Sequence, residues 1–142
     1  MSAEQTKTFA LLDTTIFFGS IIQGGFASGD AISVKKKSPS SVSAEGVDGT
    51  VARAKTGSKL YEIKIKVLQT SAMNAVLTAI YEIQEATGLL LPFAYKDQNG
   101  ADVFVSPEAW ITDLPEMTRG NKINDQEWTI EAANGRLFLG GN

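Results

Sequence analysis

The stretch that decides the fold is Ser58–Gly88, SKLYEIKIKVLQTSAMNAVLTAIYEIQEATG. Its first part alternates apolar and charged side chains, which is the period-2 pattern of a strand buried on one face. The apolar members are Tyr61, Ile63, Ile65 and Val67, and the charged members between them are Glu62, Lys64 and Lys66. This pattern predicts one long strand with its apolar side toward a core.

The second part of the same stretch predicts a helix over about Ala72–Thr87. Ser71 stands where an N-cap belongs, and Asn74 is a weak substitute for the Glu or Gln of a capping box. Gly88 follows the last periodic turn, as expected of a left-handed C-terminal cap. Apolar residues recur at spacings of three and four, which places them on one face toward a sheet: Met73, Val76, Leu77, Ile80 and Ile83.

The composition argues against an enzyme that depends on a metal, a thiol or a histidine base. The 142 residues include no Cys and no His, so thiolate metal sites and the commonest general base are missing. No P-loop sequence is present, and Gln23–Asp30 is rich in Gly but lacks the spacing of a dinucleotide-binding loop. We therefore expect no enzymatic activity, no metal and no cofactor. No apolar run is long enough to cross a bilayer, so we expect no membrane insertion by this chain.

Charge is unevenly distributed along the chain, although the net charge is only −3. Residues 35–66 carry eight basic and three acidic residues, whereas residues 67–142 carry four basic and ten acidic residues. The simplest interpretation is two solvated faces. The alternatives are attraction between opposite ends of two copies, which builds rings or filaments, or binding of the basic part to nucleic acid. The candidate stacking charges are Lys35, Lys36, Lys37, Asp113 and Glu116.

On the N-terminal side, the sequence predicts two strands and a long hairpin. Residues 14–23 are β-branched and aromatic and predict a strand bent at Gly19, and residues 31–36 alternate as a second strand. Residues 40–58 are small and polar around Asp48-Gly49, a strong hairpin signal. In an isolated domain this hairpin would be a mobile surface feature, and in an assembling protein it would extend over a neighbouring subunit.

On the C-terminal side, apolar stretches separated by turn signals predict further strands. A strand over 89–96 is followed by a turn at 97–100 and by a return strand that Pro107 interrupts. Residues 123–132 alternate, Asn134-Gly135 predicts a chain reversal, and 136–139 form a last strand. With seven or eight strands and one helix, the fold class is mainly β (α+β), an antiparallel sandwich or small barrel with one flanking helix. The expected domain is residues 14–142, after a loose N-terminal segment at 1–13.

Two pairs of side chains have a structural and a functional interpretation. Trp110 and Trp128 lie in apolar strands, where large aromatic residues mostly fill a core or an interface, but they are also suited to line the pocket of a monomeric barrel that binds a small ligand or a sugar. Asp113 and Glu116 are the pair that a carboxylate-based hydrolase would need in a cleft, although loop acids are usually solvated. Oligomeric state separates the ligand-binding barrel from an assembling subunit.

The order of several short motifs from about Asp30 to Asn142 resembles the tail tube protein family of contractile-tailed bacteriophages. These are DGTVARA (Asp48–Ala54), LQTSAMNAVL (Leu68–Leu77), KDQNG (Lys96–Gly100), AWI (Ala109–Ile111), EWTIEAA (Glu127–Ala133) and LFLGGN (Leu137–Asn142). Each motif is weak, but the ordered set is specific. Family relatives tend to carry uncharged residues where this chain has Lys64 and Lys66, which leaves open which strand face lines the channel.

The resemblance implies a structural virion protein that forms stacked hexameric rings, with one barrel closed across subunits and a lumen that conducts double-stranded DNA during ejection. It implies that the helix packs outside the barrel and that the 40–58 hairpin reaches the adjacent ring. Other implied partners are the tail sheath, the baseplate or tube initiator, the tape measure and the tail terminator, with assembly in the host cytoplasm. The candidate inter-ring residues are Asp48, Gly49, Arg53, Lys55 and Lys59.

A conduit should not hold its DNA, because each contact between a lysine and a phosphate adds salt-dependent affinity. We therefore expect an acidic or neutral lumen that Lys64 and Lys66 do not line. A tube of the type VI secretion kind has the same architecture and stays open as an alternative.

Overall fold

The computed structural model describes residues 14–19, 21–22, 31–97 and 99–141. The expectation of a loose segment at 1–13 lies outside these residues. The described elements are β1 (Thr14–Phe18), β2 (Ile21–Ile22), β3 (Ile32–Lys36), β4 (Ser41–Glu45), β5 (Val51–Lys55), β6 (Tyr61–Leu68), α1 (Met73–Thr87), β7 (Leu91–Asp97), β8 (Val103–Asp113), β9 (Asp125–Ala133) and β10 (Arg136–Phe138).

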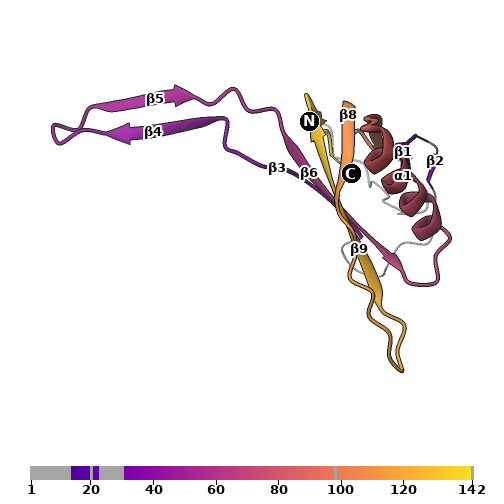
Figure 1. Cartoon of the computed structure of the whole chain (residues 1–142). Helices are drawn as coiled ribbons and strands as arrows, with labels where there is room; N and C mark the ends of the chain where they lie inside the picture. The colour runs from indigo at the N-terminus through magenta and orange to yellow at the C-terminus, as the bar shows by residue number, and fades with distance from the viewer. Residues whose placement is uncertain (1–13, 20, 23–30, 98, 142) are drawn as a thin grey trace, which may run out of the picture.

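Strands far apart in the sequence form one curved antiparallel sheet. Its order is β2-β1-β7-β8-β9-β6-β3, with β10 also paired to β8, while β4 and β5 form a separate two-stranded sheet. Helix α1 covers one face of the large sheet, and the β4–β5 hairpin projects far from it (Figure 1). The predicted fold class, mainly β with one flanking helix, is confirmed. The architecture is a half-barrel rather than a sandwich of two separate sheets.

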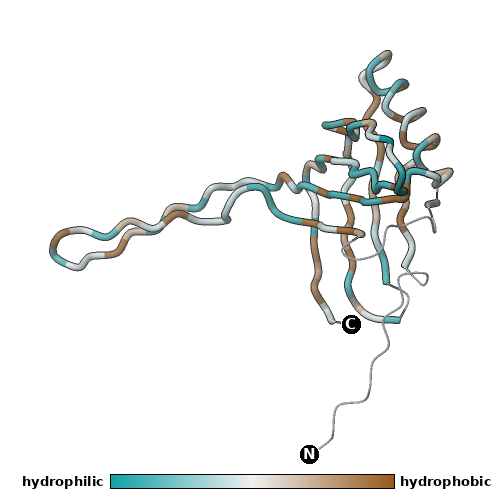
Figure 2. The backbone as a smooth tube through the Cα atoms, turned by 90° about the horizontal axis from the view of Figure 1, so that it is seen from below, coloured by the Kyte–Doolittle hydropathy of each residue, from teal (hydrophilic) through white to brown (hydrophobic). Residues whose placement is uncertain are grey.

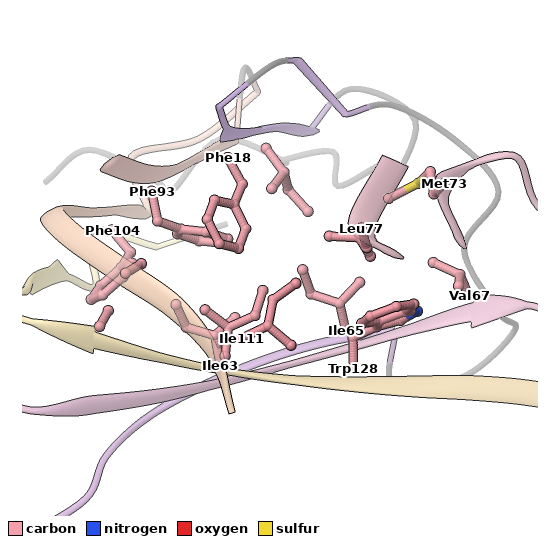
Figure 3. Close-up of a cluster of buried hydrophobic side chains, with 14 residues drawn as sticks. Phe18, Ile63, Ile65, Val67, Met73, Leu77, Phe93, Phe104, Ile111 and Trp128 are labelled. Atoms are coloured by element: carbon pink, nitrogen blue, oxygen red, sulfur yellow. The ribbon is translucent and has the colours of Figure 1, made fainter. Parts of the chain in front are cut away.

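The core lies on the concave side of this sheet, beneath α1. Ile63, Ile65 and Val67 on β6 are fully buried, as the alternation predicts, and Lys64 between them is exposed. Phe18 and Phe93 approach them from the opposite wall (Figure 3), and the rings of these two phenylalanines pack edge to face at 5.7 Å between centroids. Each large apolar side chain buried in this way stabilises the fold by about 1.5–3 kcal/mol.

The helix occupies the predicted stretch but begins differently. Ala72, not Ser71, holds the N-cap position, and its backbone is already helical, so no side chain caps the helix there. The Ser71 hydroxyl accepts a hydrogen bond from the Met73 N–H at 3.2 Å, one residue earlier than a capping box requires. Gly88 ends the helix with φ 69°, a left-handed conformation that costs Gly little.

Two predictions about the C-terminal strands were wrong. Pro107 does not interrupt β8, because it lies at the bulge where the register between β7 and β8 shifts, and a proline is tolerated there. Asn134-Gly135 does not reverse the chain, because β9 and β10 pair with β8 in one continuous register. Asn134 has φ 55° and makes a kink within this composite strand. Beside the kink, the buried Ser106 hydroxyl donates to the Ala133 carbonyl at 2.7 Å.

The β4–β5 hairpin, named the arm from here on, extends from the ends of β3 and β6 as a sheet of its own, joined to them by two backbone hydrogen bonds. The Lys37 N–H donates to the Leu60 carbonyl and the Thr56 N–H to the Ser40 carbonyl, both at 3.0 Å. All residues from 42 to 57 are exposed, and both backbone views show the arm standing clear of the sheet (Figures 1 and 2). Among the described residues, no helix has the length and apolar character needed to span a membrane.

Candidate assembly surfaces

The tip of the arm is a tight turn built around Asp48. Its carboxylate accepts the Thr50 N–H at 3.0 Å, and Gly49, with φ 88°, donates its N–H to the Gly46 carbonyl at 3.0 Å. The hydrogen bond from the Thr50 backbone lowers the pKa of Asp48 below its usual range. Two residues therefore explain why the sequence signals a turn here. The Asp48 carboxylate accepts a hydrogen bond from the backbone two residues later, and Gly49 adopts a positive φ at little cost.

The strands of the arm have two unlike faces, because residues opposite each other in a ladder share a face. Val42 lies opposite Ala54, and Ala44 lies opposite Ala52, so one face is small and uncharged. The other face pairs serines and Glu45 with Val51, Arg53 and Lys55. Of the predicted inter-ring residues, Arg53 and Lys55 thus share one face of the arm, and Lys59 is exposed between the arm and β6.

The three lysines at the end of β3 do not act as one cluster. Lys35 points to the side of the sheet opposite the core, and the Lys36 ammonium donates to the Ser40 hydroxyl at 2.5 Å. Lys37 forms an ion pair with Glu131 at 2.7 Å. Its pKa is raised chiefly by the hydrogen bond to Glu131, and the charge of Asp113 adds to this attraction. Lys37 and Asp113 therefore attract each other within one copy, although both were candidates for stacking between copies.

Beyond Lys37, the side of the sheet opposite the core, named the polar face, carries a ladder of opposite charges. Lys64 lies 3.6 Å from Glu62 and 3.8 Å from Glu127, and Lys66 lies 3.8 Å from Glu127. The strand registers and the Lys37–Glu131 pair place six basic and six acidic residues on this face. They are Lys35, Lys37, Lys64, Lys66, Lys96, Arg136, Glu62, Glu108, Asp113, Asp125, Glu127 and Glu131. Exposed pairs of this kind add little stability, about 0–1 kcal/mol each, but they neutralise one another locally.

At the end of β8, the two acids of the hydrolase hypothesis border one surface groove. Asp113 and Glu116 line a depression of about 490 Å³ together with Asp125 and Glu127. No His, Cys or Lys is among its lining residues. Within the described part of the chain, no three metal-ligating side chains come together. The groove gives no support to a catalytic reading.

The side chain of Asn74 joins the long strand, the helix and β9. Its amide nitrogen donates to the Leu68 and Ser71 carbonyls at 3.0 and 3.1 Å, and its oxygen accepts the indole N–H of Trp128 at 3.0 Å. Trp128 is only 2% exposed and belongs to the core, whereas Trp110 is half-buried and borders a surface groove beside Gly88. Sequence reasoning placed Asn74 in a cap and missed its bond to Trp128, because the partner is 54 residues away.

The outer side of α1 forms an apolar groove that sequence reasoning assigned to the core. Met73 and Leu77 are buried as expected, but Val76 and Ile83 are 40% and 51% exposed. These two line a cavity of about 410 Å³, named the α1 groove. Its lining residues are Gly19, Val76, Ala79, Ile80, Ile83, Gln84, Leu89 and Leu91, none of them charged. The helical periodicity was correct, but it did not reveal which part of the apolar face is left uncovered by the described residues.

A half-barrel with open edges, a helix on one face and a protruding arm is the fold of tube proteins from contractile injection systems. The chain belongs to the bacteriophage PhiTE tail tube protein family, whose model matches residues 11–140. The match begins before the region where the motif resemblance was evident. The protein is thus a structural phage tail tube protein and not an enzyme.

Two further kinds of comparison agree with this assignment. The chain is 28% identical to structural protein ORF10 of Pseudomonas phage KPP10 over 149 residues, covering 99% of this chain and 86% of the relative. Among solved structures, the tube-terminating cap of the anti-feeding prophage matches with a TM-score of 0.60 at 14% identity, covering 97% and 95% of the two chains. A chain of the extended PVC sheath–tube complex matches with a TM-score of 0.56 at 16% identity, covering 92% and 91%. At these identities, the structural matches show a shared fold alone.

Proposed function

We propose that this protein is the subunit of the inner tail tube, in which six copies close one barrel, rings stack head to tail, and the lumen conducts double-stranded DNA during ejection. The observation that carries the proposal is the incomplete sheet. Within the described residues, β3 pairs only with β6, so its other edge offers unpaired backbone groups over Ile32–Lys36. Such an edge invites pairing with another chain, and closure into a barrel removes it.

The sheet also has the two sides that a tube wall requires. Helix α1 and the core lie on one side, and the ion-paired polar face lies on the other. We assign the polar face to the lumen and α1 to the outside. This assignment gives up the expectation that Lys64 and Lys66 avoid the lumen. It keeps a neutral lining, because both lysines are paired with glutamates and the basic and acidic residues on this face are equal in number.

The remaining parts of the proposal concern domain layout and partners. We propose that residues 14–142 form a single domain with the arm as its extension, and that the arm contacts a neighbouring ring. The structural relatives include a tube-terminating cap and a sheath–tube complex. Their presence supports a tail terminator and a sheath among the partners here, alongside a baseplate initiator and a tape measure protein. Assembly would take place in the host cytoplasm, and the tube would end up in the virion tail.

Electron microscopy of the purified protein at high concentration tests the central claim. Hollow rods or six-fold rings are the expected result, either from the protein alone or after an assembly initiator is added. A monomer that stays monomeric at every concentration, with and without the initiator, would overturn the proposal and favour the ligand-binding barrel. If end-on images show rings with a number of copies other than six, only the claim of a hexameric ring is overturned, and the tube proposal stands.

A further inference from the structure

The last four residues of β8 have an edge to which no strand of the described chain is paired. The ladder between β7 and β8 ends at Leu91 and Ala109, whereas β8 itself runs on to Asp113. On their other side these four residues stay paired with β9. The edge that faces away from β9, named the outer edge of β8, is therefore a place where another chain can add a strand.

The side chain of Gln84 occupies this outer edge at Ile111. The Ile111 N–H donates to the Gln84 amide oxygen at 2.7 Å, and the Gln84 amide nitrogen donates to the Ile111 carbonyl at 2.9 Å. A glutamine amide offers the same kinds of donor and acceptor as a peptide group, so it fills the place of one residue of a neighbouring strand. Beside it lies a depression of about 420 Å³ with room for further side chains, lined by Gln84, Glu85, Gly88, Leu90 and Trp110.

Strand β3 presents a second free edge, at the other end of the row β8-β9-β6-β3. The Ala31 carbonyl accepts the Lys66 N–H at 2.7 Å, and the Lys37 N–H donates to the Leu60 carbonyl at 3.0 Å. Odd-numbered residues of this stretch therefore face β6, because alternate residues of an antiparallel strand turn their backbone groups to opposite sides. The residues whose N–H and C=O groups point away from β6 are Ile32, Val34 and Lys36.

The two edges fit each other in direction and in charge. The strands β3, β6, β9 and β8 alternate in direction, so β3 and β8 run opposite ways. Rotation about a tube axis does not change the direction of a strand along that axis, so β3 of one copy meets β8 of the next as an antiparallel neighbour. On the polar face, Lys35 forms no ion pair within the described residues, and Asp113 ends β8. Opposite charges across an interface favour one partner.

We propose that β3 of one copy adds to the outer edge of β8 in the next copy of the ring, and that it replaces Gln84 at the Ile111 backbone. The inference rests on the proposed function, and it names the two strands that close the barrel and the side chain that gives way between them. In the free subunit, the Gln84 amide satisfies Ile111 and protects the edge against wrong pairing. In the ring, β3 takes over its two hydrogen bonds, and the polar face continues from copy to copy.

The absence of cysteine from the sequence makes the strand pairing easy to test by site-specific crosslinking. The test variant is S33C/T112C, with exposed thiols on β3 and near the end of β8 and an unchanged charge. The matched control is S33C/T78C, whose second thiol is exposed on α1. Assembled tubes are treated with a short bismaleimide and separated on a denaturing gel. We expect a ladder of dimers and higher species from the test variant, at least tenfold more intense than from the control.

Assembly of Q84A tests the replacement of Gln84 without a crosslinker. Alanine removes the two bonds that compete with β3 and leaves the backbone of β8 unchanged. We expect the Q84A monomer to melt at a lower temperature and yet to form tubes at a critical concentration at least about threefold lower, since one hydrogen bond contributes a factor of this order. T78A is the control, because it removes a bond within α1, from the Thr78 hydroxyl to the Asn74 carbonyl at 2.6 Å, and should not lower the critical concentration.

The outcomes separate the inference from the proposed function. Tubes that give no ladder from S33C/T112C, or equal ladders from both cysteine variants, overturn the pairing of β3 with β8 and leave the tube intact. A critical concentration that is unchanged or higher in Q84A overturns the replacement of Gln84. A wild-type protein that forms neither rings nor tubes overturns the proposed function, and the inference with it.

Discussion

At the scale of single residues, Asn74 is the side chain whose loss should be felt most widely, because it links β6, α1 and β9 through one amide. In N74A, the indole N–H of Trp128 would remain buried without its acceptor. We expect a loss of about 1–3 kcal/mol in the free energy of unfolding, measured by urea denaturation. N121A, in the exposed segment before β9, is the control and should change stability by less than about 0.5 kcal/mol. Equal midpoints for the two variants would show that the Asn74–Trp128 bond contributes nothing.

Gly135 is a second residue whose substitution should be costly, because the structure leaves no room there for a side chain. A Cβ there would lie 2.8 Å from Tyr61 and 2.9 Å from Phe104, both of which pack at the kink between β9 and β10. We expect G135A to lower the free energy of unfolding by about 1–3 kcal/mol, the usual cost of overpacking. G120A is the matched control, since a Cβ at Gly120 meets no atom within 4 Å. A G135A protein as stable as G120A would mean that the kink relaxes freely.

The chemistry of these residues was only partly predictable. Turn and cap signals such as Asp48-Gly49 and Gly88 depend on local backbone geometry, so the sequence alone indicates them. Contacts such as Asn74 with Trp128, or Gln84 with Ile111, join residues 54 and 27 positions apart. Nothing in the neighbouring sequence marks them, because they exist only once the strands have found their order.

At the scale of elements, the turn of the arm should respond to pH through Asp48. Its lowered pKa means that the folded turn favours the carboxylate. The stabilisation is therefore complete above the usual pKa of Asp and is lost as the pH falls through the lower pKa of the folded turn. We expect the Thr50 amide signal in NMR spectra to titrate with a midpoint below 3.8, the ordinary value for Asp. D48N should abolish this titration, and a midpoint at or above 3.8 would contradict the proposed bond.

The arm as a whole should be dispensable for folding and required for assembly. The Thr56 N–H already bonds the Ser40 carbonyl, so an Asn-Gly turn can join these two residues after deletion of 41–55. Because the deleted residues are almost all exposed, we expect the free energy of unfolding to stay within about 1 kcal/mol of the full chain. Under conditions in which the full chain assembles, electron microscopy should show no tubes. A deletion variant that unfolds, or one that still forms tubes, would contradict this division of roles.

Most elements could be located from the sequence because their periodicities are strong. The alternation along β6 and the three-and-four spacing along α1 gave both elements to within a residue or two. The continuity of β9 and β10 could not be predicted, since Asn-Gly is a common reversal signal and only pairing with β8 shows that the chain goes straight on. The exposure of Val76 and Ile83 was missed for a related reason, because periodicity defines an apolar face but not its partner.

At the scale of the whole molecule, the polar face should control how a tube interacts with its DNA. In E62Q/E127Q, Lys64 and Lys66 lose the carboxylates that lie within 4 Å of them. We expect tubes of this variant to retain DNA more strongly, with a salt dependence steeper by about 0.9 for each lysine that contacts a phosphate. Retention is measured by co-sedimentation of short duplexes over a series of salt concentrations.

The matched control for that experiment is E82Q/E85Q, which removes two acids from α1 rather than from the polar face. It changes the net charge by the same amount on the side that we assign to the outside. If both pairs of substitutions raise retention equally, the effect comes from overall charge, and the assignment of the polar face to the lumen is wrong.

The order of the strands could not be derived from the sequence. β1 pairs with β7 and β6 pairs with β9, so the sheet depends on contacts across most of the chain. Such pairings are specified by packing of the whole core, which no local pattern encodes. The family resemblance, in contrast, was visible from short motifs because it depends on their order and not on the strand pairings.

The direct connections of β3 to β4 and of β5 to β6 have a mechanical consequence. A pull on the tip of the arm stretches β4 and β5 side by side, so their hydrogen bonds are not peeled apart one at a time. The tension then enters β6, which is bonded to β3 on one side and to β9 on the other. Force applied by a neighbouring ring would thus reach the middle of the sheet and spread over two ladders of hydrogen bonds. The tube wall would therefore resist stretching and twisting through strands that carry load from one subunit into the next.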